Sequence, residues 1–115
     1  MKRKQPERQL QAAVATYLRA ALPPDAFFSA LPGGDRQMTR APGYRAGLPD
    51  LMVVWNAKPI FIELKSKRGT ISDDQAIAIN ALWRAGAEAA VCRSIDEVAS
   101  VLKFSGIPLL ARVAA

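Results

Sequence analysis

The sequence of 115 residues lacks histidine and contains a single cysteine, Cys92. Without histidine or a second cysteine, the chain cannot build a zinc finger, a disulfide framework or a catalytic centre that uses histidine as its acid or base. Cys92 itself follows the run AEAAV, which we interpret as a buried strand. We therefore expect an inert core thiol rather than a nucleophile.

A long hydrophobic run is also absent. After the basic start MKRKQPERQLQAAV, polar residues such as Gln11 and Arg19 interrupt every apolar stretch, so neither a signal peptide nor a membrane span is visible. We expect a cytoplasmic protein with no membrane partner. Because 50% of the residues are hydrophobic and 23% are charged, without repeats or low-complexity segments, residues 1–115 are predicted to form one globular domain.

Acidic residues are scarce in the first part of the chain. Residues 1–68 hold 12 Lys and Arg against 5 Asp and Glu, a balance of +7, whereas residues 69–115 hold 4 against 5, a balance of −1. Lys and Arg that neutralise phosphates supply the sequence-independent part of nucleic-acid affinity. The asymmetry favours a polyanion such as DNA as the partner, and a merely solvated basic surface is the alternative.

The order of helix and strand signals predicts the fold class. Apolar residues at helical spacing, with Pro6 in the first turn, predict a helix over 6–22. Two capping boxes, Ser72 with Gln75 and Ser94 with Glu97, predict two further helices. Strands are predicted at 26–31, 51–55, 60–64 and 88–92. This order indicates an α/β fold with a mixed β-sheet flanked by helices.

The two later helices have recognisable ends and apolar positions. The helix after Ser72 is expected to end at Gly86, and the helix after Ser94 is expected to run to about Phe104. The apolar positions of the first of these helices are Ile77, Ile79, Leu82 and Trp83.

The predicted hairpin carries charged residues on one face. Because side chains alternate along a strand, Glu63 and Lys65 point the same way. A hairpin that turns at NAKP would place Asp50 opposite Lys65 and Leu51 opposite Leu64. Asp50 is therefore predicted to lie close to Glu63 and Lys65.

These three residues form a candidate hydrolytic site. Converging carboxylates repel each other, so a hard divalent cation is the natural third component, and oxygen ligands suit Mg²⁺ or Mn²⁺. A charged Lys65 cannot bind the metal, but it can orient water or stabilise the negative charge that grows on a phosphate during hydrolysis. The alternative is that Glu63 and Lys65 are ordinary residues of an exposed strand face.

The motifs of the chain, in their order, resemble the virus-type replication-repair nuclease (VRR-NUC) domain, a branch of the PD-(D/E)xK nuclease superfamily. The resemblance extends from about Glu7 to Leu102 and keeps the proline and aspartate of the motif as Pro49 and Asp50. The segments that carry it are GLPD at 47–50, IELK at 62–65, GTISDDQ at 69–75 and the early helix with Glu7.

The resemblance implies a restriction-endonuclease-like core. In that core Asp50, Glu63 and the backbone carbonyl of Leu64 would bind Mg²⁺ or Mn²⁺, and Lys65 would be the catalytic lysine. Two further residues are carried over in the same way.

Glu7 resembles the helix carboxylate that completes the metal site, and Gln75 resembles the polar residue of the following helix that faces it. Each has a simpler explanation, since Glu7 favours the positive end of its own helix and Gln75 can serve only as a cap.

The function implied is that of a metal-dependent, structure-selective DNA endonuclease. A chain of this size has little surface for reading a long base sequence, because single modules bury only about 600 to 1,000 Å². The resemblance to stand-alone VRR-NUC proteins implies a homodimer that cuts branched DNA such as four-way (Holliday) junctions in repair. The alternatives are a non-catalytic nucleic-acid-binding module of the same fold, a ribonuclease and a restriction-type subunit.

DNA contacts and the dimer interface are assigned to particular segments. A long Gly- and Pro-rich loop precedes the site, and loops of this length in small domains commonly carry function. The apolar tail at 106–115, for which a core position is not obvious, or the helix before it, is a candidate for the dimer interface, with an edge strand or a loose terminus as alternatives for the tail. The predicted DNA-binding residues are Arg36, Arg40, Arg45, Lys67 and Arg68.

Overall fold

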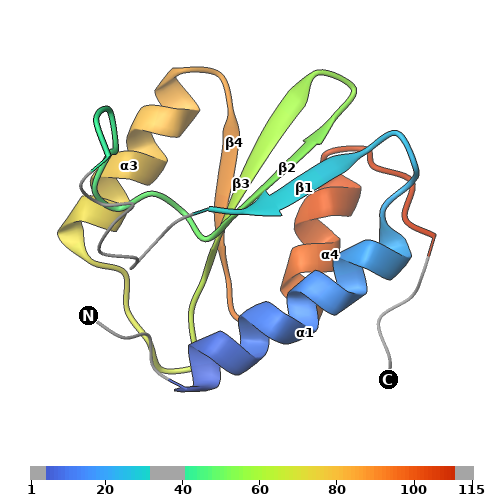
Figure 1. Cartoon of the computed structure of the whole chain (residues 1–115), viewed down its shortest axis with the longest axis horizontal. Helices are drawn as coiled ribbons and strands as arrows, with labels where there is room; N and C mark the ends of the chain where they lie inside the picture. Colours follow the sequence, from blue (N-terminus) through green and yellow to red (C-terminus); the bar gives the residue numbers. More distant parts are fainter. Residues whose placement is uncertain (1–4, 32–40, 111–115) are drawn as a thin grey trace.

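The computed structural model describes residues 5–31 and 41–110. Its helices and strands follow the predicted order, with ends that differ from the prediction by one or two residues (Figure 1). The elements are α1 (Gln5–Ala21), β1 (Phe27–Ala30), β2 (Leu51–Trp55), β3 (Lys58–Leu64), α3 (Asp73–Arg84), β4 (Glu88–Cys92) and α4 (Ile95–Phe104).

The four strands form one mixed sheet in the order β1-β2-β3-β4. β1 pairs with β2 and β2 with β3 in antiparallel fashion, whereas β3 and β4 are parallel. Figure 1 shows α3 on one side of the strands and α1 with α4 on the other. The prediction of an α/β fold with a mixed sheet flanked by helices is confirmed. None of the helices in the described part of the chain is long and apolar enough to cross a membrane.

The register of the hairpin differs from the prediction. Leu51 lies opposite Ile62 rather than Leu64, because the turn consists of two residues, Asn56 and Ala57, both with positive φ. Such two-residue turns suit the twist of antiparallel strands, and the turn leaves Lys58 free to pair with Trp55. The predicted four-residue turn at NAKP was therefore wrong. Since the slip is two residues, every side chain stays on the predicted face.

One face of the sheet supplies the main core. Leu51 and Val53 of β2 and the alternate residues of β3 are fully buried there and pack against α1 and α4. Cys92 belongs to this core, and burial raises the pKa of its thiol to about 12. The prediction that Cys92 lies in the core is confirmed. The helix residues of the cluster include Val14, Leu18, Val98 and Leu102.

The two predicted capping boxes have different outcomes. At α3, the Ser72 hydroxyl accepts from the Gln75 amide and the Gln75 side chain accepts from the Ser72 amide, so this box is complete. At α4, the Ser94 hydroxyl accepts from the Glu97 amide, but Oε1 of Glu97 accepts from the amide of Arg93 instead. The second box is therefore only half formed, because the glutamate reaches one residue further back along the chain.

The start of the C-terminal tail is part of the core. Ile107 is buried in the main cluster, Leu109 packs against it, and the Leu110 amide donates to the carbonyl of Ala21. The expectation that residues 106–115 lack a core position was wrong for this part of the tail. Residues 111–115 lie outside the described part of the chain.

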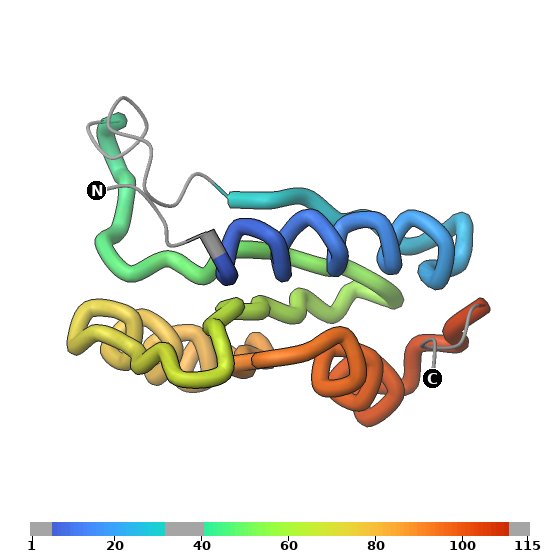
Figure 2. The backbone as a smooth tube through the Cα atoms, turned by 90° about the horizontal axis from the view of Figure 1, so that it is seen from below, coloured from blue at the N-terminus to red at the C-terminus, as the bar shows by residue number. Residues whose placement is uncertain are grey.

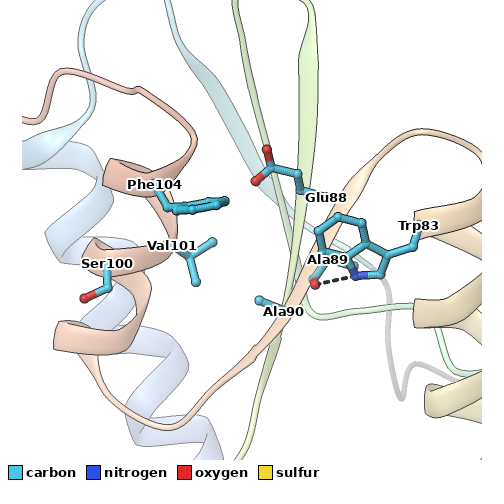
Figure 3. A pocket seen from close by; sticks show the side chains of 7 residues that line it. All are labelled: Trp83, Glu88, Ala89, Ala90, Ser100, Val101 and Phe104. Atoms are coloured by element: carbon cyan, nitrogen blue, oxygen red, sulfur yellow. Dashed lines mark hydrogen bonds between the residues drawn. The ribbon is translucent and has the colours of Figure 1, made fainter.

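An apolar pocket lies between α3 and α4, beside β4 (Figure 3). Its volume is about 390 Å³, and two aromatic side chains border it: Trp83, which is 53% exposed, and Phe104, which is 87% exposed. Trp83 thus supplies one of the predicted apolar positions of its helix without entering the core. We call this cavity the β4 pocket, and its lining residues are Trp83, Glu88, Ala89, Ala90, Ser100, Val101 and Phe104.

Candidate active site

The charged residues of the hairpin meet where β2 begins and β3 ends. Asp50 directly precedes β2, Glu63 is the second-last residue of β3, and Lys65 directly follows β3. All three are buried, with 6%, 2% and 8% of their surface exposed. Ionisable residues are almost never buried without a partner, so this cluster is a candidate site on burial alone. We call Asp50, Glu63, Lys65 and Gln75 the acidic site.

Backbone pairing brings the carboxylates together. Continuing the observed register by one residue places Asp50 opposite Glu63, on the sheet face opposite the main core. Oδ2 of Asp50 accepts a hydrogen bond from the Leu64 amide at 2.7 Å. This bond ties the aspartate to the end of β3. The prediction that Asp50 lies close to Glu63 is confirmed, although the register used to make it was wrong.

Glu63 is the electrostatically unusual residue of the acidic site. Burial, followed by the nearby charge of Asp50, raises its pKa from 4.5 to about 8, and Lys65 opposes this shift. Its Oε2 lies 3.5 Å from Nζ of Lys65. Its Oε1 is buried and accepts no hydrogen bond from any residue in the described part of the chain. A buried carboxylate oxygen without a donor, beside a second carboxylate, is the donor set that a hard divalent cation would satisfy.

Gln75 performs two roles that the sequence presents as alternatives. Its Oε1 caps α3 by accepting from the Ser72 amide at 2.8 Å, while its Nε2 donates to Oε2 of Glu63 at 3.0 Å. One amide side chain offers both an acceptor and donors, so the same residue starts the helix and orients the glutamate. Gln75 thus lies in the acidic site as the resemblance implies.

Glu7 lies on α1, a different element from those that carry the acidic site. A Cβ atom at Gly69, in the chain segment that follows β3, would lie 2.9 Å from its Oε2; Figures 1 and 2 show this segment passing the first turn of α1. In residues 5–31 and 41–110, no three His, Cys, Asp or Glu side chains come close enough together to hold a metal ion by themselves. The roles of Glu7 and of the Leu64 carbonyl as metal ligands stay predictions.

Gly47 was not recognised as a structural requirement of the site. It has φ +81°, and a Cβ atom there would lie 2.2 Å from the Asp74 carbonyl oxygen and 2.6 Å from the Gln75 amide nitrogen. The absence of a side chain lets the segment before Asp50 pack directly against the first turn of α3. The glycine of GLPD was the available signal, but only the fold shows what it approaches.

Arg93 was also missed. Its Nη1 donates to the carbonyl oxygens of Ser66 and Gly69, at 2.8 and 2.6 Å, so it bridges the segment that follows Lys65. An arginine just after a strand gave no sign in the sequence of this contact, which spans 24 to 27 residues along the chain.

The predicted DNA-binding residues are only partly described. Arg45, Lys67 and Arg68 are exposed, and the last two lie in the segment that follows Lys65. Arg36 and Arg40 lie outside the described residues. The assignment of all five to DNA contact stays a prediction.

The sequence of the chain matches a known protein family. The model of the VRR-NUC domain matches residues 2–96. The chain belongs to the VRR-NUC family. This is a nuclease-type family, and the predicted resemblance is confirmed. No curated protein matches the chain.

Two solved structures of VRR-NUC domains have a similar fold. One, described as a VRR_NUC domain protein, is 22% identical, with a TM-score of 0.67, and the match covers 90% of this chain and 89% of that one. The other, described as a VRR_NUC domain, is 19% identical, with a TM-score of 0.63, and the match covers 87% of this chain and 97% of that one. They show that the chain shares the α/β fold of these domains.

Proposed function

We propose that this VRR-NUC protein is an Mg²⁺- or Mn²⁺-dependent endonuclease that hydrolyses phosphodiester bonds in DNA. One observation carries the proposal: the buried Glu63, with an unsatisfied Oε1, lies against Asp50 and beside Lys65. A purely structural carboxylate buried to this extent would be fully hydrogen-bonded. A binding-only module would gain nothing from placing two carboxylates where a phosphate has to approach.

Asp50 and Glu63 are the residues that would hold the cation. When bound, the cation supplies Lewis-acid stabilisation of negative charge on the phosphate. Binding favours the ionised form of Glu63, whose pKa is about 8 without metal. Gln75 keeps Oε2 of Glu63 in place through its Nε2, which leaves Oε1 as the oxygen available to a ligand.

Lys65 is the residue that would stabilise the negative charge that develops during the reaction. Its ammonium group lies 3.5 Å from Oε2 of Glu63, and its backbone amide, just past β3, donates to the Cys92 carbonyl. A positive charge held in a buried site stabilises the extra negative charge of the transition state more strongly than it stabilises the ground state. It can also hold and orient the attacking water by hydrogen bonding.

We propose branched DNA, such as a four-way junction, as the substrate and a homodimer as the active form. Symmetric incision of two strands needs two sites related by a two-fold axis, the commonest symmetry of soluble oligomers. Light scattering should then give twice the chain mass of 12.4 kDa. Mixing wild-type protein with an excess of Glu63→Gln should yield nicked junctions instead of paired cuts. A strict monomer that still makes paired cuts would contradict the dimer and leave the nuclease proposal standing.

The nuclease proposal is tested with labelled duplex, flap, splayed and four-way DNA, each with Mg²⁺, with Mn²⁺ and with EDTA. RNA versions of the same substrates separate a deoxyribonuclease from a ribonuclease. We expect cleavage only with metal, and faster cleavage of the branched DNA. Binding without cleavage in every metal condition would favour the non-catalytic module instead.

A further inference from the structure

The segment Ser66–Gly69 follows Lys65 and closes on itself. The Gly69 amide donates to the Ser66 carbonyl at 3.0 Å, which makes the segment a four-residue turn with Lys67 and Arg68 at its two central positions. Both central residues are exposed. We call Ser66–Gly69 the basic turn.

Arg93 holds the basic turn at both of its ends. Nη1 of Arg93, just past β4, donates to both end carbonyls, those of Ser66 and Gly69. On the side of α1, Oε2 of Glu7 lies so close to Gly69 that a Cβ atom there would come within 2.9 Å of it. The turn is thus bridged by an arginine on one side and has a carboxylate close to its last residue.

We infer that Arg93 is a positioning residue of the nuclease: it fixes the basic turn so that Lys67 and Arg68 contact the DNA backbone beside the acidic site. Hydrogen bonds from a charged donor are roughly twice as strong as neutral ones, and a guanidinium group is well suited to bridging two carbonyls. An exposed turn with two long cationic side chains would otherwise lose conformational entropy when it bound a phosphate. Arg93 removes part of that loss before DNA arrives.

This inference rests on the proposed function, and its first test is independent of activity. Hydrogen exchange of the Gly69 amide reports whether the turn is closed. We expect Arg93→Gln to speed this exchange about tenfold, while Arg84→Gln, which removes a positive charge from the exposed end of α3, leaves it unchanged. Unchanged exchange in Arg93→Gln would overturn the inference.

The second test is a double-mutant cycle on binding to a four-way junction in EDTA. In the wild-type background, Arg93→Gln should weaken affinity about tenfold, more than Arg84→Gln does. In a Lys67→Gln/Arg68→Gln background, the effect of Arg93→Gln should fall to that of Arg84→Gln, because the residues that Arg93 positions are gone. Equal effects in both backgrounds would mean that Arg93 acts only through its own charge, and would overturn the inference.

Arg93→Lys covers the case in which Arg93→Gln fails to fold. It keeps the charge but is shorter and lacks the planar fork, so positioning predicts faster Gly69 exchange and weaker binding than in the wild type, whereas a charge-only role predicts neither. A wild-type protein that binds but never cuts DNA would contradict the proposed function alone. Changes in Arg93→Gln would then still show that the turn is positioned for binding.

Discussion

The acidic site and the β4 pocket differ in how their polar groups are satisfied. The β4 pocket is large and mainly apolar, and two of its polar side chains have partners within the protein. Nε1 of Trp83 donates to the Ala89 carbonyl at 2.9 Å (Figure 3), and Glu88 accepts from the Ser105 hydroxyl. The acidic site instead buries two carboxylates, and Oε1 of Glu63 has no donor among the described residues.

An apolar cavity and the site of a reaction need not coincide. A large apolar pocket is the usual first guess for a ligand site. Here the pocket is lined mainly by apolar groups, whereas the acidic site buries ionisable side chains beside one another, and burial together with the charge of Asp50 raises the pKa of Glu63. Substitutions in the two regions should therefore have very different consequences.

The largest expected effect is the loss of cleavage in Glu63→Gln. Replacing one ligand oxygen by an amide should lower the cleavage rate by about a hundredfold or more, and Asp50→Asn should behave in the same way. The matched control is Glu88→Gln in the β4 pocket, which changes a glutamate remote from the chemistry and should leave the rate unchanged. Cleavage assays with saturating metal decide the matter; wild-type rates in either acidic-site variant would remove that residue from the site.

In the absence of metal, Glu63→Gln should be more stable than the wild type. Because the pKa of Glu63 is raised from 4.5 to about 8 in the folded state, its protonation stabilises the wild-type fold at low pH, and this contribution is lost as pH rises toward 8. Glutamine does not titrate. Thermal unfolding in EDTA should therefore show an advantage of Glu63→Gln that grows between pH 4.5 and about 8. A pH-independent difference would contradict the raised pKa.

Lys65→Ala should separate binding from chemistry. Its charge matters most in the transition state, so single-turnover cleavage at saturating enzyme should fall by about a hundredfold while DNA affinity changes little. Lys58→Ala, in the exposed hairpin at the start of β3, controls for the loss of one positive charge. If affinity falls and the single-turnover rate is preserved, Lys65 is a phosphate contact only.

Gly47→Ala should affect stability and the acidic site together. The added Cβ would clash with the first turn of α3, and the positive φ adds strain, so we expect a loss of about 1–3 kcal/mol in the free energy of unfolding and slower cleavage. Gly43→Ala is the matched control, since Gly43 has φ +86° and a Cβ atom added there would meet no other atom within 4 Å. Equal losses in the two variants, measured by denaturant unfolding, would reduce the role of Gly47 to its φ angle.

The smallest effect should come from the β4 pocket. Trp83→Phe keeps most of the apolar surface but loses the hydrogen bond to the Ala89 carbonyl, so the free energy of unfolding should fall by about 1 kcal/mol, with cleavage unchanged. Phe104→Ala, at a more exposed position, should change stability by less than about 0.5 kcal/mol. A large loss of cleavage in either variant would contradict the statement that the β4 pocket takes no part in the reaction.

Much of the fold could be predicted because its signals are local. The short apolar, β-rich runs of β2 and β3, and Ser72 with Gln75 at the start of α3, depend on neighbours a few residues away. The hairpin turn was harder to predict from the sequence, because Ala57 adopts a positive φ, which is uncommon for alanine. The predicted pairing of Asp50 survived that error because a two-residue slip preserves the face.

The α/β order of elements and the proximity of Asp50 to Glu63 follow from local sequence patterns, because they depend on strand periodicity and on short connections. Three other features come from the packing of distant segments: Gln75 both caps its helix and donates to Glu63, Gly47 lets the segment before Asp50 pack against α3, and Arg93 bridges the basic turn. The same packing places Ile107 in the core and leaves Trp83 at the edge of a pocket. The physical reason is that hydrogen-bond partners and close contacts between distant segments are set by how helices pack on the sheet, which local patterns do not encode.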